Sequence, residues 1–113
     1  MVRNISFSKT TEQFKARTKD VTRRIGWKDL KPGTPLNAVE KAQGLKKGEH
    51  VTYLGMIIVK NVRRECLKRL IDEPEYGKRE MIREGFPGMN PLDFVAMFPP
   101  TIGKVTRIEY GYT

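Results

Sequence analysis

The stretch Val51-Thr52-Tyr53-Leu54-Gly55-Met56-Ile57-Ile58-Val59-Lys60-Asn61-Val62 decides the fold, because it has the clearest strand pattern in the chain. Alternate residues of a strand share a face, and both faces of this segment carry apolar side chains: Val51, Tyr53, Ile57 and Val59 on one, and Leu54, Met56 and Ile58 on the other. This pattern predicts a central strand that is buried on both sides. Gly55 predicts a bulge in its middle, and Arg63 and Arg64 mark its expected end.

Shorter elements are expected before this strand. Val2 to Phe7 is typical of a strand, and Thr10 with Gln13 three positions later resembles a capping box that opens a helix ending near Thr18. The Pro32-Gly33 pair predicts a tight turn, followed by a strand from Pro35 to Ala42 and a glycine-flanked loop from Gly44 to Gly48.

After the central strand the hydrophobic period becomes helical. Leu67, Leu70 and Ile71 indicate one helix, with Cys66 expected as a small core residue at its start. A second helix is expected from Pro74 to Arg83, stopped by Gly85, and a third begins at the Asn90-Pro91 pair. Phe94, Val95 and Phe98 supply the buried stripe of the third helix. The alternation from Lys104 to Tyr112 predicts a closing strand.

Strands far apart in sequence and interrupted by helices predict an α+β fold, a small mixed or closed β-structure with helices at its mouth. A doubly wound sheet does not fit, since no glycine-rich phosphate loop lies between a strand and a helix. The chain of 113 residues has the size of one ordinary domain, so residues 1–113 are expected to form a single domain.

The charge of the chain is strongly basic and unevenly distributed. The formal net charge is +9, from 22 Lys and Arg against 13 Asp and Glu. Residues 1–31 hold nine basic and three acidic groups, residues 41–69 hold eight and two, and residues 72–84 hold three and five. A basic body with one acidic segment favours a polyanion partner such as RNA, or a nucleotide-like ligand.

Neither a metal site nor a membrane anchor is indicated by the composition. One cysteine, Cys66, and one histidine, His50, cannot supply a disulfide framework or a tetrahedral zinc site, so we expect no metal and no cofactor. The longest apolar run, Leu54 to Val59, is too short to cross a bilayer, and Met1 to Thr10 lacks the apolar region of a secretion signal. The sequence therefore predicts a cytoplasmic protein without a membrane partner.

The run Lys19-Asp20-Val21-Thr22-Arg23-Arg24 carries the most chemistry in the chain. A partly desolvated lysine can lose its proton and act as a base, and planar arginine forks suit phosphates and carbonyl oxygens. Residues three apart on a strand point to opposite faces, so Lys19 and Thr22 can meet only where a helix end bends into a strand.

The order of these motifs resembles the ASCH domain, a family related in fold to PUA domains. The resemblance rests on the Lys-x-x-Thr-x-Arg run that begins at Lys19, then Trp27, a Lys-Pro-Gly turn at Lys31, and the segment Glu84-Gly85-Phe86, and it covers Phe7 to Ile108. It implies a small PUA-like β-barrel with helices closing one end over a basic cleft, and a link to RNA and modified nucleosides.

The family includes amidohydrolases that remove the acetyl group from N4-acetylcytidine with a Lys, a Thr three residues later and a Glu. By position these would be Lys19, Thr22 and Glu84, with Glu80 one helical turn earlier as the alternative acid. The chain departs from the family pattern at Arg17, where glycine is common, and at Asp20, where threonine is common. Its insert around Glu84 is also longer.

The leading hypothesis is therefore a protein that binds RNA or a modified nucleoside through a basic cleft. The expected binding side chains are arginines and aromatics that can meet phosphates and bases: Arg17, Arg23, Arg24, Trp27, Arg64 and Phe86. The alternatives are an amidohydrolase acting on N4-acetylcytidine or a related exocyclic amide through Lys19, Thr22 and Glu84, a ribonuclease, and a module that docks an acidic protein.

Overall fold

The protein is an α+β molecule built on a five-stranded sheet. A computed structural model describes residues 2–40 and 51–113. Along the chain the elements are β1 (Arg3–Ser6), α1 (Thr11–Lys15), β2 (Val21–Arg24), β3 (Pro35–Val39), β4 (Tyr53–Cys66), α2 (Arg69–Asp72), α3 (Pro74–Glu84), α4 (Pro91–Val95) and β5 (Lys104–Tyr112). The α+β class predicted from the sequence is confirmed.

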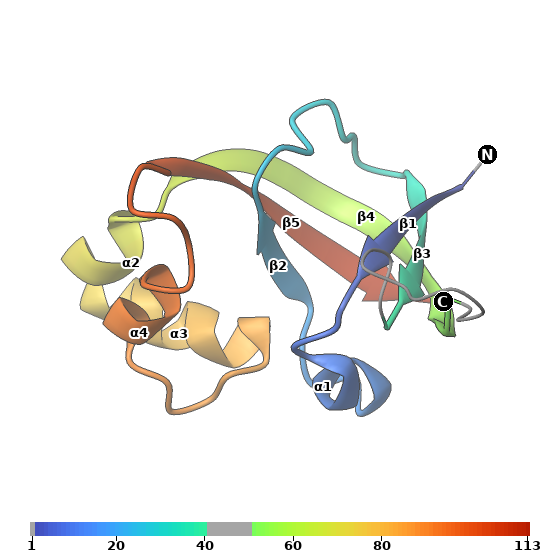
Figure 1. Ribbon diagram of the computed structural model, residues 1–113, viewed down its shortest axis with the longest axis horizontal. Coiled ribbons are helices and arrows are strands. Elements are labelled where there is room, and N and C mark those ends of the chain that lie inside the picture. The colour runs from blue at the N-terminus through green and yellow to red at the C-terminus, as the bar shows by residue number, and fades with distance from the viewer. Residues whose placement is uncertain (1, 41–50) are drawn as a thin grey trace.

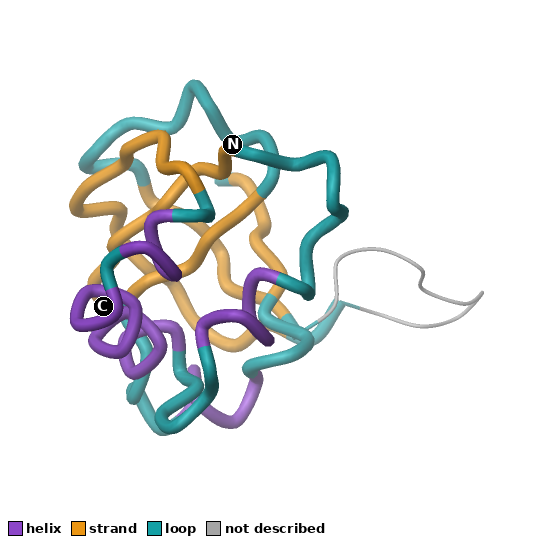
Figure 2. The backbone as a smooth tube through the Cα atoms, turned by 90° about the vertical axis from the view of Figure 1, so that its left-hand side faces the viewer, coloured by secondary structure: helices purple, strands orange, loops and turns teal. Residues whose placement is uncertain are grey.

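The sheet has the strand order β1-β3-β4-β5-β2, so β4 is its central strand, as predicted, and β1 and β2 are its edges (Figure 1). All neighbours are antiparallel except β1 and β3, which run parallel. The sheet curls into a half-barrel, and in the end-on view of Figure 2 the strands curve behind the helices. This curl turns the two edge strands towards each other.

Bulges in β4 help to bend the sheet. Gly55 pairs with Ala38 whereas Tyr53 pairs with Val39, which leaves Leu54 as an extra residue beside the predicted glycine. A second register shift near Lys60 lies between the pairs Val59 with Tyr110 and Asn61 with Glu109. Each extra residue increases the local twist and bend of the strand.

Three predictions for β4 and its last residue, Cys66, were wrong. The strand does not end at Arg63 and Arg64 but continues to Cys66, because its pairing with β5 extends through Cys66 opposite Lys104. It is also not buried on both faces throughout, since Tyr53 is 58% exposed and only Ile57 and Val59 among its apolar side chains are fully covered. Cys66 is exposed rather than in the core, because it ends a strand instead of starting a helix.

Strand β5 is covered on both faces and joins two hydrophobic clusters. Ile108 and Tyr110 belong to the cluster inside the curl of the sheet, together with Phe7 and Phe14. Val105 belongs to a second cluster, formed with the side chains of the α2–α4 region. The predicted range of this strand, Lys104 to Tyr112, is confirmed. Its side chains contribute to both hydrophobic clusters.

The helices keep their predicted order but differ in detail. The capping box at Thr10 is wrong: the Thr10 side chain makes no cap hydrogen bond, and α1 ends at Lys15 rather than near Thr18. Helix α3 spans the predicted range to within one residue, and Gly85 ends it in the left-handed conformation with φ 93°. Asn90 caps α4 as predicted, accepting a hydrogen bond from the Leu92 amide, but this helix ends at Val95.

The predicted loop from Gly44 to Gly48, the end of the predicted strand at Ala42, and His50 lie outside the described residues.

Candidate functional site

A cavity of about 250 Å³ lies where the end of β1, the start of β2 and the helices α3 and α4 meet. We call it the Lys19 cavity. Its wall comes from segments far apart in sequence: Ser6, Phe7, Ser8, Lys9, Thr10, Lys19, Thr22, Arg23, Arg24, Glu84, Phe86, Phe94, Met97 and Phe98. Six of the nine site residues predicted from the sequence line it: Lys19, Thr22, Glu84, Arg23, Arg24 and Phe86.

Lys19 and Glu84 form a buried ion pair in this wall. The Lys19 Nζ lies 3.8 Å from the Glu84 Oε1, and each side chain is 3% exposed. Burial lowers the pKa of Lys19 to about 8, against the opposing charge of Glu84. Burial also raises the pKa of Glu84 above its usual value, although Lys19 and Arg23 oppose the change. Burial thus disfavours the charged form of both groups.

The backbone around Lys19 is hydrogen-bonded to α3 and to β5. The Asp20 amide donates to the Arg83 carbonyl at 2.9 Å, and the Tyr112 hydroxyl donates to the Lys19 carbonyl at 2.5 Å. A Cβ placed on Gly85 would lie 3.2 Å from the Lys19 Cβ, so the end of α3 approaches Lys19 closely. These contacts bring a loop residue and a helix residue to the same point.

The two residues of the expected capping box serve the site instead. The Lys19 Nζ donates to the Thr10 Oγ1 at 3.4 Å, and the Gln13 Nε2 donates to the Gly85 carbonyl at 3.1 Å. The hydroxyl and the amide thus connect α1 to the Lys19–Glu84 pair, which explains why neither caps the helix.

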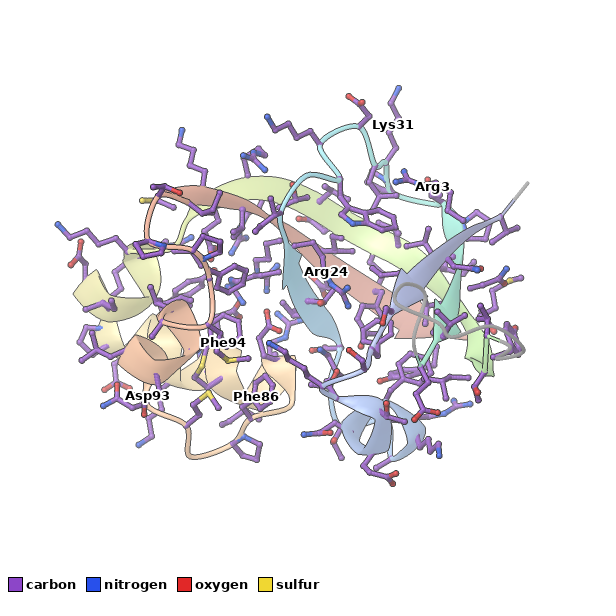
Figure 3. All side chains as sticks on the ribbon, in the orientation of Figure 1. Arg3, Arg24, Lys31, Phe86, Asp93 and Phe94 are labelled. Atoms are coloured by element: carbon purple, nitrogen blue, oxygen red, sulfur yellow. The ribbon has the colours of Figure 1, made fainter. Side chains whose placement is uncertain are left out.

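Thr22 and Arg24 lie on the same face of β2 and contact each other. The Arg24 Nε donates to the Thr22 Oγ1 at 2.9 Å, and Arg24 also donates to the Ser6 carbonyl of β1. Arg24 therefore links the two edge strands, and Figure 3 places it on the β1 side of β2. Because the Thr22 oxygen accepts from Arg24, its own hydrogen is available to a ligand in the cavity.

Arg23 points to the opposite face of β2 and is buried in carboxylates. Its guanidinium is 0% exposed and donates to Glu65 at 2.8 Å, to Glu80 at 2.5 Å and to Glu84 at 2.9 Å. These ion pairs, led by those with Glu84 and Glu65, outweigh desolvation and raise the Arg23 pKa further. Arg23 thus fixes Glu84 in place, and most of its donors are occupied within the protein.

Glu84, rather than Glu80, faces the Lys19 cavity. Both oxygens of Glu80 accept from Arg107, at 2.6 and 3.2 Å, and one also accepts from Arg23. Although burial opposes it, these hydrogen bonds lower the pKa of Glu80 to about 2. Glu80 therefore stays ionised and occupied, whereas Glu84 is the carboxyl beside Lys19.

One side of the cavity is aromatic. Phe86, Phe94 and Phe98 form a series of ring contacts, with centroids 6.1 Å apart for the first pair and 5.5 Å for the second. Figure 3 shows Phe86 and Phe94 on the helical side of β2. Phe7 lies at the polar side, where its ring centroid is 5.1 Å from the Lys19 Nζ. The cavity thus has a charged end and an aromatic wall, a combination that suits a flat polar ring.

The other three predicted binding residues lie away from the cavity wall. Trp27 packs beside the inner core, with the Arg3 guanidinium 4.1 Å above its ring. Arg64, on β4, donates to the Thr106 Oγ1 at 2.8 Å. Arg17 is exposed near the Tyr112 ring and has φ 57°.

Several residues of the site were missed by the sequence reasoning. Thr10 and Phe7 contact Lys19 only because β1 and α1 fold against β2, and Phe94 and Phe98 were assigned to packing alone. The ion pairs of Glu65 and Arg107 were missed because both residues lie within strands whose register the sequence does not specify. Period-two alternation puts Arg107 on the face opposite Ile108 and Tyr110, beside Glu109, so the pattern gave no signal that this arginine is buried.

Within residues 2–40 and 51–113 no three His, Cys, Asp or Glu side chains gather into a set that could hold a metal ion. None of the helices in the described part of the chain has the length and apolar character needed to cross a bilayer. No protein-family model matches the chain, and no curated protein or solved structure matches it either.

Proposed function

We propose that this protein is an ASCH-type, PUA-like domain that binds RNA or a modified nucleoside in the Lys19 cavity. The observation that carries the proposal is the buried Lys19–Glu84 pair, with both side chains 3% exposed, in a cavity whose other wall is aromatic. A nucleobase has a flat π-face and a polar edge. Phe86 and Phe94 offer surfaces to the face, and Lys19, Thr22 and Glu84 offer donors and acceptors to the edge.

The half-barrel and the position of Arg17 support the resemblance to the ASCH family. The family commonly has glycine two residues before the lysine, and here Arg17 has φ 57°, a conformation that glycine adopts at little cost. The backbone at this position therefore keeps the shape that a glycine would favour. The net charge of +9 supports a polyanionic ligand.

The binding proposal is tested by calorimetric titration of cytidine, N4-acetylcytidine and a single-stranded cytidine hexamer into the purified protein. Lys19→Ala and Thr22→Val are the site variants, and Lys15→Ala, an exposed lysine on α1, is the matched control. Binding that the two site variants lose and the control keeps supports the proposal. Absence of binding for all three ligands, or equal loss in the control, rejects it.

A second candidate, amide hydrolysis, is favoured by the shifted pKa values of the pair. With a pKa of about 8, a fraction of Lys19 is neutral at physiological pH and can take a proton from water as that water attacks the acyl carbon. The proton then passes to Glu84, 3.8 Å away, and on to the leaving exocyclic nitrogen. The products are the free amine and the carboxylic acid. Arg24 in the wall is the candidate donor to the oxyanion.

Hydrolysis is tested by incubating the protein with N4-acetylcytidine and separating cytidine by chromatography. We expect release by the wild type and by Lys15→Ala, and none by Lys19→Ala or Glu84→Gln. If N4-acetylcytidine binds but stoichiometric protein releases no cytidine, binding alone is the function.

A further inference from the structure

A second cavity, of about 520 Å³, lies along α3 near the Lys19 cavity. We call it the arginine cavity. Its lining is Arg63, Tyr76, Arg79, Glu80, Ile82, Arg83 and Arg107, so four guanidinium groups face one carboxylate. Glu80 in this wall and Glu84 in the wall of the Lys19 cavity are one helical turn apart, about 6 Å along the helix axis. Both carboxylates bind Arg23, which itself lines the Lys19 cavity.

Three arginines stand side by side across the sheet beneath α3. Arg107 on β5 is paired in register with Arg23 on β2 and with Arg63 on β4. Like charges directly opposite each other destabilise a sheet, and here Glu65, Glu80 and Glu84 offset the cost. The exposed fraction of the side chain increases along the row, from 0% for Arg23 to 3% for Arg107 and 41% for Arg63. Arg63 is therefore the open end of the row.

The open end of this row keeps unused hydrogen-bond donors. Glu80 is occupied by Arg107 and Arg23, and Arg83 is held by Asp20 and Glu109, each at 3.0 Å. Among the described residues, Arg63 donates to Glu65 and to Tyr76, both times from Nη2. Arg79 is exposed and forms no ion pair with another described residue. Arg63 and Arg79 can therefore each present a guanidinium edge to an anion in the cavity.

We propose that the arginine cavity binds a phosphate group of RNA while a base of the same strand occupies the Lys19 cavity. Planar guanidinium forks match the oxygens of a phosphate, and Arg63 and Arg79 supply them from a strand and from a helix. Arg83 and Arg107 are already paired with carboxylates, so Arg63 and Arg79 are the expected phosphate contacts. This inference rests on the proposed function and extends it: the preferred ligand is an oligonucleotide rather than a free nucleoside.

The first test uses inorganic pyrophosphate, which reports on the arginine cavity without needing a base. The Nε–H signals of the arginines are followed by NMR in the wild type, Arg79→Glu and Lys78→Glu. Lys78→Glu is the matched control, because Lys78 is adjacent to Arg79, is also exposed and lines a different cavity. The substitution changes the charge by the same amount as Arg79→Glu. On addition of pyrophosphate, we expect the Arg63 and Arg79 signals of the wild type to shift. The Arg63 signal should also shift in Lys78→Glu, and it should not shift in Arg79→Glu.

The second test measures the affinity of the cytidine hexamer against salt for the same three proteins. Arg79→Glu should weaken binding on the order of tenfold, because a charge-assisted phosphate contact is lost and a repulsion is added. The slope of log affinity against log salt should also become shallower by about 0.7 for the lost contact. Lys78→Glu should change affinity only about twofold, since screening weakens its longer-range effect. Nucleoside affinity should be the same in all three.

The outcomes separate this inference from the proposed function. Absence of an Arg63 or Arg79 shift with pyrophosphate overturns the inference, as does an equal loss of hexamer affinity in Arg79→Glu and Lys78→Glu. In both cases nucleoside binding that depends on Lys19 would leave the proposed function intact. If neither nucleoside nor hexamer binds, the proposed function fails and the RNA subsite fails with it, whatever pyrophosphate does.

Discussion

Lys19 and Glu84 place opposite charges 3.8 Å apart at a point where each side chain is 3% exposed. Removing charges from water costs several kcal/mol per ion, and the pair offsets only part of this cost. Burial is the largest cause of both the lowered pKa of Lys19 and the raised pKa of Glu84. The surrounding groups hold the pair in place: Thr10 accepts from Lys19, and Arg23 donates to Glu84.

The first prediction concerns the pH dependence of stability. The Lys19 pKa is about 8 in the folded protein against 10.5 unfolded, so between these values the unfolded chain binds the extra proton. The contribution of Lys19 to the free energy of unfolding should therefore rise with pH across this window, by at most about 1.4 kcal/mol per pH unit. Urea unfolding of the wild type and Lys19→Met at pH 7, 8, 9 and 10 measures the difference.

The same comparison with Lys15→Met is the control, since Lys15 is 55% exposed in its side chain. The change with pH should be larger for Lys19→Met, because Lys19 is the buried side chain of the two. A flat difference for Lys19→Met would mean that Lys19 titrates normally and is not buried as described.

The second prediction concerns Arg23, whose guanidinium binds three buried carboxylates. Arg23→Met should lower the free energy of unfolding by about 3–5 kcal/mol, because the carboxylates remain buried without their common partner. Arg23→Lys should recover little of this loss, since an ammonium cannot reproduce the planar fork. Urea denaturation measures both. Lys15→Ala, which breaks an exposed pair with Glu12, should cost less than about 1 kcal/mol.

The third prediction separates backbone strain from crowding at Gly85. Gly85→Ala forces a side chain onto φ 93° and brings its Cβ to 3.1 Å from Gln13 and 3.2 Å from Lys19. Gly88→Ala meets a similar φ of 85° with nothing within 4 Å, so it reports the backbone cost alone, about 1–3 kcal/mol. Gly85→Ala should lose more stability than this control and also weaken ligand binding. Equal losses would show that the contact with Lys19 is loose.

The fourth prediction concerns Arg17, where strain and binding act in opposite directions. Its φ of 57° costs a residue with a Cβ about 1–2 kcal/mol, and glycine's greater loss of conformational freedom costs about 0.5–1 kcal/mol, so Arg17→Gly should raise the free energy of unfolding by about 0.5–1 kcal/mol. This holds if the contact with the Tyr112 ring, at 5.2 Å, contributes little. If Arg17 also contacts RNA, hexamer affinity should fall while stability rises. Thermal unfolding and titration of the same variant measure the two effects independently.

Much of the fold could be predicted because it depends on local patterns. The range of β5 follows from alternation alone, the end of α3 follows from Gly85, and the start of α4 follows from the Asn90-Pro91 pair. The errors come from residues whose partners are distant. Thr10 and Gln13 have the spacing of a capping box, but their side chains form other hydrogen bonds. Thr10 accepts from Lys19, and Gln13 donates to the Gly85 carbonyl. Strand β4 continues beyond its predicted end at Arg63 and Arg64, because β5 pairs with both residues.

The sequence by itself determined the alternating strands, the helix boundaries that glycine, asparagine and proline mark, and the strongly basic charge, since each depends on neighbouring residues or on composition. Only the tertiary structure decided which charges are paired. Arg23 and Arg24 are adjacent in the chain, yet the pleat of β2 sends them to opposite faces, one into three carboxylates and one towards Thr22 and β1. Strand register and the burial that shifts the Lys19 pKa arise from long-range packing, which no local pattern encodes.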